Sequence, residues 1–407
     1  MIKKILHTSD WHIGRKLKNK ERSGEFIKFF SWLADVIKNE NIEALLVAGD
    51  IFDNTTPSVK AQNIYYSFLG KIAKSSCRHV IIISGNHDSP AFLDAPKDLL
   101  KLCKIHVIGQ ACENPEDEVI TLYDASQEPE LIICAVPYLR DRDVRTFNVG
   151  DDVNNIEKSL IDGIKNHYEK VFEHAKKLKE NSKIPVIGMG HLFATGGKIS
   201  EDEGVRSLYV GNSVEINSNI FPDFLTYTAL GHLHSPQKIS RENIRYSGAP
   251  IAMGFGEIKN KKSVYVLELE DEKLMNIKEI QVPVFQRLER IEGGMDEICS
   301  ALDFLTLQNQ SIWLDITYTG GEAQGNLQEK IDTYIKDFQL EVLSIRDESK
   351  GPSKINNKEI SRNLEDIEPF EMLEILFNQK QVPENQREIF ISMYKEILTK
   401  TETEILP

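Results

Sequence analysis

The chain has 407 residues, of which 41% are hydrophobic and 28% charged, and its formal net charge is −14 at pH 7. This length is too great for one hydrophobic core, so we expect two or three domains. No apolar run is long enough to cross a membrane, and the apolar stretch near the N-terminus is too short for a signal peptide, so we expect a cytoplasmic protein that binds no membrane. The acidic composition argues against a surface coated with basic nucleic-acid contacts. It does not exclude an enzyme that acts on nucleic acids, because bound metal cations or a partner protein can supply the positive charge that binds phosphates.

Apolar strand-like runs alternate with helical patterns through residues 1–282, which indicates an α/β domain with a central sheet. The predicted strands occupy residues 2–9, 43–49, 79–84, 131–138, 185–190 and 226–231. Helical spacing of apolar residues predicts helices in 21–40, 57–75 and 154–180. Because the strand runs are almost continuously apolar, each is expected to be buried on both faces. From the residues alone, this pattern favours a doubly wound sheet.

The pattern changes after Pro283, where a small α+β domain is expected in residues 283–348. Its predicted elements are strands in 284–293, 311–319 and 339–346 and helices in 294–307 and 326–337. Alternation in 311–319 predicts a half-buried strand. Residues 349–363 are predicted to be a linker. Residues 364–407 carry two short amphipathic helices, whose apolar stripes require a surface either on this chain or on another protein.

Side chains that bind metals or protons follow five of the predicted strands. They are Asp10 and His12 after the first strand, Asp50 and Asp53 after the second, Asn86, His87 and Asp88 after the third, His191 after the fifth, and His232 and His234 after the sixth. Each cluster alone is more typical of a turn, a cap or a hydrogen-bonded histidine. Ligands of α/β sheets bind beyond the carboxyl ends of strands, so all five clusters are expected to meet there. Together they predict a metal site.

The types of donor narrow the choice of metal. Aspartate, asparagine and histidine without thiolates favour a divalent first-row metal such as manganese or iron over calcium or structural zinc. Two such ions, about 3.5–4 Å apart, clamp a phosphoryl group between them. Two cations need a bridging carboxylate, and Asp50 is the best-placed candidate. The third strand is interpreted as stopping at Gly85 because the backbone has to turn to present Asn86 and His87 to the metals.

The ordered set D-x-H, G-D-x-x-D, G-N-H-D, G-H and G-H-x-H, which covers residues 10–234, resembles the calcineurin-like metallophosphoesterases. The resemblance implies a two-metal phosphoester hydrolase built as a β-sandwich of two facing mixed sheets flanked by helices. We adopt this α/β fold in place of the doubly wound sheet. The resemblance also implies the ligand sets, which are Asp10, His12, Asp50 and His234 for one metal and Asp50, Asn86, His191 and His232 for the other.

The same resemblance implies roles for the remaining residues of the motifs. His87 lies beside the phosphate as a general acid or transition-state stabiliser, which suits a side chain whose pKa lies near neutrality. Asp53 orients His87, as the second aspartate of G-D-x-x-D does in the phosphatases of the family. Asp88 is the candidate for a structural role.

Longer segments, among them HTSDWHIGRKL, VAGDIFDNTTPS, ISGNHDSP and ALGHLHSPQ, resemble the SbcD family of nuclease subunits from bacterial SbcCD complexes. This resemblance implies a DNA nuclease of repair, recombination and replication that uses two divalent metal ions, typically manganese, with magnesium or iron as alternatives. The implied activities are a 3′-to-5′ exonuclease on duplex ends and an endonuclease on single strands and hairpins. Residues 283–348 correspond to a DNA-capping domain.

Partners are also implied by the resemblance to the SbcD family. The C-terminal helices in 364–407 are expected to dock on the ATPase SbcC, giving a complex of two copies of each subunit. The nuclease subunits of the family pair as homodimers, for which the helices in 21–40 and 57–75 are plausible surfaces. The chain has no P-loop of its own, because Leu192 stands where FATGGKIS would need the first glycine. We therefore expect this chain to bind no nucleotide.

Basic residues beside two of the motifs are candidates for contacts with DNA phosphates. They are Arg15, Lys16 and Lys18 after the first motif and Arg140 and Arg142 after the fourth strand. Solvated basic loops explain these residues equally well.

Two alternative functions fit parts of the pattern. A small-molecule phosphodiesterase or phosphatase shares the metal motifs, but the protein phosphatases continue G-D-x-x-D with Arg-Gly, where this chain has Asn54-Thr55. Such an enzyme also has no use for a capping domain and a docking tail. A catalytically silent scaffold predicts missing ligands, whereas every ligand position and His87 are filled here.

Overall fold

The computed structural model describes residues 3–144, 153–197, 215–320 and 326–348, together with three isolated positions near the C-terminus. The predicted linker in 349–363 and, apart from those three positions, the predicted helices in 364–407 lie outside the described residues. None of the described helices combines the length and the apolarity needed to cross a membrane.

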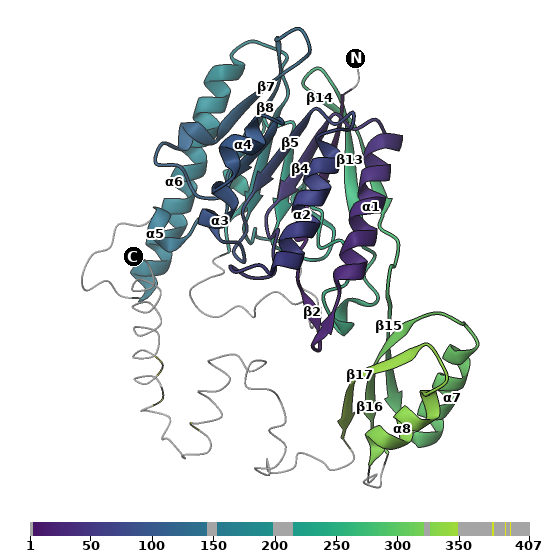
Figure 1. Ribbon diagram of the computed structural model, residues 1–407. Helices are drawn as coiled ribbons and strands as arrows, with labels where there is room; N and C mark the ends of the chain where they lie inside the picture. Colours follow the sequence, from purple (N-terminus) through teal and green to yellow (C-terminus); the bar gives the residue numbers. More distant parts are fainter. Residues whose placement is uncertain are drawn as a thin grey trace. The chain divides into compact units, whose positions relative to one another are not determined.

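The first of two large sheets has the strand order β14-β13-β1-β4-β5-β6 (Figure 1). Its parallel strands are β1 (Lys3–Thr8), β4 (Ala44–Ala48), β5 (His79–Ile83) and β6 (Ile105–Ile108). The antiparallel pair β13 (Ser263–Glu270) and β14 (Lys273–Gln281) extends the sheet beside β1. Helices α1 (Ser23–Asn39) and α2 (Val59–Ile72) cover its outer face, where their apolar side chains form one core with those of the strands.

The second large sheet has the order β11-β12-β10-β9-β8-β7. Its parallel strands are β8 (Pro129–Ala135), β9 (Val186–His191), β10 (Tyr227–Gly231) and β12 (Arg241–Tyr246). The antiparallel strands β7 (Val119–Tyr123) and β11 (Gln237–Ile239) form its edges. Helix α6 (Val153–Lys179) packs on its outer face.

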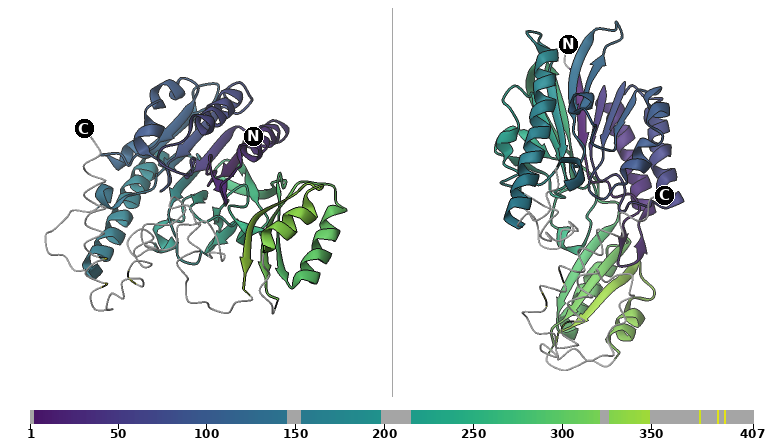
Figure 2. Two further views of the ribbon diagram at one scale, coloured as in Figure 1. Left: turned by 60° about the horizontal axis from the view of Figure 1, so that its bottom comes forward. Right: turned by 90° about the vertical axis from the view of Figure 1, so that its left-hand side faces the viewer.

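The two large sheets face each other, and a third apolar cluster from both, including Leu46, Ile81, Ile187 and Tyr227, fills the space between them. Figure 2 (right) shows α6 on one outer side of the strands and α1 with α2 on the other. The β-sandwich expected from the family resemblance is confirmed, and the single doubly wound sheet is wrong. A strand between a helix and a second sheet is buried on both faces just as one between two helices is, so its apolar run does not distinguish the two folds.

Shorter elements connect the layers of the sandwich. They are β2 (Lys16–Leu17), β3 (Lys20–Glu21), α3 (Pro90–Asp94), α4 (Lys97–Lys101), α5 (Asp141–Val144), and the 3-10 turns η1 (Pro115–Glu118), η2 (Ser218–Ile220) and η3 (Phe255–Glu257). The hairpin of β2 and β3 follows the first metal motif directly.

A third sheet, β15 (Arg287–Gly293), β16 (Ile312–Tyr318) and β17 (Leu340–Asp347), is parallel and carries α7 (Met295–Thr306) and α8 (Leu327–Ile335). The strand predicted in 311–319 is present as β16, but its predicted half-burial is wrong, because every residue of β16 is buried. As the central strand, β16 turns one face to the core beneath α7 and α8. On its other face, Trp313 packs with Leu17 and Phe255.

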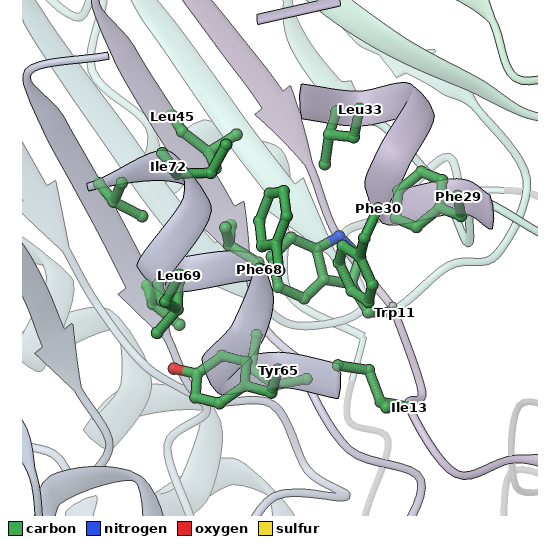
Figure 3. Packing of buried hydrophobic residues seen from close by; sticks show 14 of the residues in the cluster. Trp11, Ile13, Phe29, Phe30, Leu33, Leu45, Tyr65, Phe68, Leu69 and Ile72 are labelled. Carbon is green, nitrogen blue, oxygen red and sulfur yellow. The ribbon is translucent and has the colours of Figure 1, made fainter. Parts of the chain in front are cut away.

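Trp11 anchors the segment that carries the first metal motif (Figure 3). Its fully buried ring meets Phe30 of α1 and Phe68 of α2 edge to face, with centroids 4.9 and 5.6 Å away. Its Nε1 donates to Thr8 Oγ1 at 3.1 Å. The residues on either side of Trp11, which are Asp10 and His12, are therefore held by the core beneath them.

Candidate metal centre

Backbone hydrogen bonds continue beyond the ends of β1 and β4 and align the loops that follow. Asp10 N donates to Gly49 O at 3.0 Å, and His12 N donates to Asp50 O at 2.9 Å. The first two metal motifs thus leave the sheet side by side, with the side chain of Asp50 next to those of Asp10 and His12.

Asp88 ties the loop after β5 to the loop after β4. Its buried carboxylate accepts hydrogen bonds from the backbone N–H groups of Ile51 (3.0 Å), Phe52 (2.9 Å) and Gly85 (2.8 Å). Three bonds from two loops make its role structural, as the sequence suggested.

Two glycines allow these loops to approach closely. Gly49 adopts a φ of +87°, and a Cβ there would lie 2.2 Å from His191 Nδ1. A Cβ on Gly85 would lie 2.1 Å from Asp50 Oδ1, although Gly85 is not among the residues with positive φ. The turn proposed for Gly85 from the sequence is therefore not the reason for this glycine. It is needed because Asp50 packs directly on its Cα.

The first group of donor atoms comes from both large sheets. Donor atoms of Asp10, His12 and His234 lie within 4.8 Å of one another. His12 Nε2 lies 3.1 Å from His234 Nε2 and 3.5 Å from Asp50 Oδ2. These four residues are the set predicted for one metal.

The second group shares Asp50 with the first. His191 Nε2 lies 3.4 Å from Asp50 Oδ2 and 3.1 Å from Asn86 Oδ1. Asn86 Oδ1 in turn lies 3.0 Å from His232 Nδ1. The structure thus brings together all seven predicted ligands, with Asp50 between the two groups.

The backbone at this centre is strained. Asp10, His12, Asp50 and His232 all have positive φ, at 50°, 46°, 49° and 106°. Such conformations in residues other than glycine cost on the order of 1–3 kcal/mol each and cluster at functional sites. The packing beneath the loops, of which Trp11 is one part, has to offset this cost.

The ionisable groups of the centre are buried and influence one another. Burial raises the pKa of the Asp10 carboxyl. Burial also acts to raise the pKa of Asp50, but His191 and His87 hold it well below its usual range. Burial acts to lower the pKa of His191, but the Asp50 carboxylate raises it to about 9. Burial lowers the pKa of His232 to about 3, so this ring is neutral.

His87 lies beside the first group and is held by Asp53. Its Nδ1 donates to the backbone carbonyl of Asp53 at 2.8 Å, and its backbone N–H donates to Asp50 Oδ1 at 2.9 Å. Its ring packs edge to face on His12, with centroids 4.8 Å apart. The carboxylate of Asp53 pairs with Arg15 at 3.1 Å, and its Oδ1 also lies 3.6 Å from His12 Nδ1. A carboxylate oxygen of Asp53 lies within 4.8 Å of ring nitrogens of His12 and His87.

Comparison with known proteins identifies the family. Residues 3–236 match the calcineurin-like phosphoesterases, and residues 284–381 match the family described as type 5 capsule protein repressor C-terminal domain. The chain is 30% identical over 390 residues to the SbcD subunit of nuclease SbcCD from Escherichia coli (strain K12), with 95% of each chain covered. The chain is an SbcD-type calcineurin-like phosphoesterase.

Other SbcD proteins are similar over most of their length. This phosphoesterase is 31% identical to the SbcD subunit of nuclease SbcCD from Bacillus subtilis (strain 168), covering 77% of this chain and 78% of that protein. It is 30% identical to the SbcD subunit from Rhodobacter capsulatus, covering 75% and 77%. As a member of this family it is a metal-dependent phosphoester hydrolase.

The side chains of this SbcD-type phosphoesterase fit the divalent metal ions of its family. His191 Nδ1 faces the carbonyl of Ala48 at 2.9 Å and donates to it, which leaves Nε2 facing Asp50 and Asn86. Asp10 and Asp50 are at most 1% exposed. Buried carboxylates and imidazoles gathered this closely are the donor set that a divalent metal ion binds.

The basic residues predicted to contact DNA fall into two groups. Arg15 and Arg140 are partly buried, and each bonds to a loop of the centre, Arg15 to the Asp53 carboxylate and Arg140 to the Asp88 carbonyl at 2.9 Å. Lys16, Lys18 and Arg142 are exposed. The positioning of the catalytic loops is therefore a second explanation for Arg15 and Arg140.

The sequence motifs missed Glu257 and Lys262. Glu257 is fully buried and lies 3.3 Å from His234 Nδ1, and Lys262 pairs with Glu257 at 2.6 Å. Both residues stand in the segment GFGEIKNKK, which has no spacing typical of metal ligands. Only the fold brings this segment to the sixth strand.

Proposed function

We propose that this SbcD-type phosphoesterase is the nuclease subunit of a two-component complex and hydrolyses phosphodiester bonds of DNA at the metal centre. One observation carries the proposal. Seven donor side chains and His87 meet at one edge of two sheets, in a chain that is similar over 95% of its length to the SbcD subunit of the E. coli nuclease.

In this proposal, Asp50 lies between two metal ions, for which manganese is the first choice. Asp10, His12 and His234 complete one set of ligands, and Asn86, His191 and His232 complete the other. When bound, the two ions supply positive charge to the phosphate and lower the pKa of water. The buried, strained loops hold the donors in place before the substrate arrives, so little reorganisation is needed during the reaction.

His87 is the proposed acid or transition-state stabiliser. Its bond from Nδ1 to the Asp53 carbonyl fixes the plane of the ring, so that Nε2 is the atom that donates a proton toward the phosphate. Asp53 therefore orients His87 with its backbone, and its carboxylate contributes through Arg15.

DNA is the proposed substrate, cut from 3′ to 5′ at duplex ends and internally in single strands and hairpins. The exposed cations Lys16, Lys18 and Arg142 are proposed to contact phosphates, with residues 283–348 as the DNA-capping domain. The work of this subunit would take place in the cytoplasm, in repair, recombination and replication.

SbcC is the proposed partner, bound through residues 364–407 in a complex of two copies of each chain. A homodimer through α1 and α2 is part of this proposal. Its support is a set of exposed apolar side chains on these helices, namely Ile27 (56% exposed), Val59 (73%) and Tyr66 (36%).

The test is cleavage of end-labelled hairpin and duplex DNA with manganese, with and without SbcC and ATP. We expect the wild-type chain to cut hairpins and single strands alone, and duplex ends when SbcC and ATP are present. His87→Ala should abolish cleavage and keep its metal content. Hydrolysis of an aryl phosphodiester without any cleavage of DNA would instead indicate a small-molecule phosphodiesterase.

Docking of SbcC is tested by deletion of residues 364–407. The truncated chain should no longer co-purify with SbcC but should still hydrolyse single-stranded DNA. Co-purification at the wild-type level would contradict the proposed docking segment.

A further inference from the structure

A buried ion pair lies against one metal-binding histidine. Glu257 is 0% exposed and Lys262 is 7% exposed, and Lys262 Nζ lies 2.6 Å from Glu257 Oε2. Glu257 Oε2 also accepts from the backbone N–H of Met253 at 2.9 Å. Oε2 of the Glu257 carboxylate thus has two partners within the protein.

Both members of the pair contact His234. Glu257 Oε1 lies 3.3 Å from His234 Nδ1, and Lys262 Nζ donates to the carbonyl of His234 at 3.0 Å. The side chain and the backbone of His234 are therefore held by the same ion pair. On the opposite side of the ring, Nε2 lies 3.1 Å from His12 Nε2, within the first group of donors.

Stability alone does not account for this ion pair. Removing two charges from water costs several kcal/mol per ion, and apolar residues of similar volume are often equally stable or more so. The Glu257 carboxylate instead faces the Lys262 ammonium at 2.6 Å on one oxygen and His234 Nδ1 at 3.3 Å on the other. An ionised acceptor beside a histidine nitrogen fixes the tautomer and makes the other nitrogen a better metal ligand.

We propose that Glu257 is a positioning residue for the metal centre. It accepts the hydrogen on His234 Nδ1 and thereby directs the Nε2 lone pair at the metal site shared with Asp10 and His12. Lys262 keeps the carboxylate in place and holds the backbone of His234. This inference rests on the metal centre of the proposed function and not on the choice of DNA as substrate.

The other metal group lacks a comparable charged acceptor at His191. His191 Nδ1 donates to a neutral backbone carbonyl, that of Ala48. Loss of the Glu257 charge should therefore weaken the site that contains His234 and spare the site that contains His191. Replacement of such outer partners typically costs 10–100-fold in metal affinity.

The experiment is calorimetric titration of the metal-free full chain with Mn²⁺, which does not depend on activity. Glu257→Gln should weaken one of the two binding events by about 10- to 100-fold and leave the other within about twofold. The matched control is Glu118→Gln, because Glu118 is also 0% exposed and also pairs with a histidine, His167, at 2.9 Å. That pair lies outside both donor groups, so the control should bind Mn²⁺ like wild type.

A second variant covers the case in which Glu257→Gln does not fold. Glu257→Gln/Lys262→Met removes both buried charges, so it leaves no unpaired ion in the core. It should fold and show the same weakened site. Unchanged Mn²⁺ affinity in either variant, or equal weakening in Glu118→Gln, would overturn the proposal. Normal Mn²⁺ binding by a wild-type chain that cuts no DNA would refute the nuclease proposal alone.

Discussion

The roles of Asp53 and Arg15 depend on contacts of single atoms that the sequence motif does not specify. The pattern G-D-x-x-D predicts an aspartate beside His87, but it does not say which atom makes the contact. The backbone carbonyl of Asp53 accepts a hydrogen bond from His87 Nδ1 at 2.8 Å, and the Asp53 carboxylate pairs with Arg15 at 3.1 Å. Burial acts to raise the pKa of Asp53, but His12 and Arg15 lower it overall, so this carboxylate is ionised.

Replacement of Arg15 should therefore impair chemistry and not only DNA binding. Arg15→Gln leaves the loop of Asp53 less firmly held, and small displacements of a catalytic group cost up to about 100-fold in rate. We expect kcat for bis(p-nitrophenyl) phosphate to fall about 10-fold or more, with unchanged KM and metal content. Lys238→Gln, on an exposed side chain, is the control. A loss confined to KM for DNA would show that Arg15 is a phosphate contact instead.

His7 makes the stability of the fold depend on pH. The ring is fully buried and contacts the hydroxyl of Tyr227 at 3.0 Å and the carbonyl of Leu230 at 3.2 Å. Burial lowers its pKa from 6.5 to about 3. Below pH 6.5 the imidazole of His7 is protonated in the unfolded chain but stays neutral in the folded chain. The contribution of His7 to the free energy of unfolding is therefore complete above pH 6.5 and is lost as the pH falls toward 3.

Between pH 7 and pH 5 the contribution of His7 should shrink by about 2 kcal/mol. Urea unfolding of the metal-free protein at the two pH values measures this loss. In His7→Gln the loss should be smaller by that amount, whatever the absolute stability of the variant. Equal pH dependence in both proteins would contradict the assignment.

At the scale of elements, the hairpin of β2 and β3 links the first metal motif to the third sheet. Leu17 packs with Phe255, Leu288 and Trp313, and Lys20 lies 2.6 Å from Glu341. This contact covers Trp313 on the second face of β16, where Asp315 pairs with Arg290 and Arg346 of the neighbouring strands. The sequence predicted the position of β16 but not its burial, because part of the cover on Trp313 comes from Leu17, almost 300 positions away.

Trp313→Ala should loosen this contact. Truncation of a buried tryptophan costs about 3–5 kcal/mol, and here the cost falls on the link between the hairpin and the third sheet. We expect faster cleavage by trypsin in the segment 282–287 and a lower urea midpoint. Phe304→Ala, which truncates an aromatic ring that is 64% exposed on α7, should behave like wild type in both assays. Equal rates of trypsin cleavage in the two variants would contradict the contact between the hairpin and the third sheet.

The positions of the predicted strands and helices agree closely with observed elements, because long apolar runs and helical spacing of apolar residues follow directly from burial. Six strands of the two large sheets, β6, β7, β11, β12, β13 and β14, were not predicted, although β13 completes the first sheet beside β1. The division of strands between two sheets could not be predicted from burial patterns either. It depends on pairings such as β1 with β13, whose residues are more than 250 positions apart.

At the scale of the whole molecule, the metal centre joins the two large sheets. Asp10, His12 and Asp50 follow strands of the first sheet, and His191 and His234 belong to the second. Ions bound between them should therefore stabilise the sandwich as a unit. At a concentration 100 times the Kd, each site should add about 2.7 kcal/mol.

Thermal unfolding measures this linkage. The Tm of the wild-type chain should rise with Mn²⁺ concentration and fall again with a chelator. Asp50→Asn, which weakens the residue shared by both donor groups, should show little dependence on Mn²⁺. A Tm of the wild type that does not respond to Mn²⁺ would contradict a metal centre between the sheets.

In the proposed centre, the five strand ends together hold two metal ions with Asp50 between them. The most direct test of this arrangement is the number of Mn²⁺ ions bound per chain, measured by elemental analysis after equilibrium dialysis. The geometry predicts two ions for the wild-type chain and loss of both at the same free Mn²⁺ concentration in Asp50→Asn. A single ion in the wild type, or two ions retained in Asp50→Asn, would contradict it.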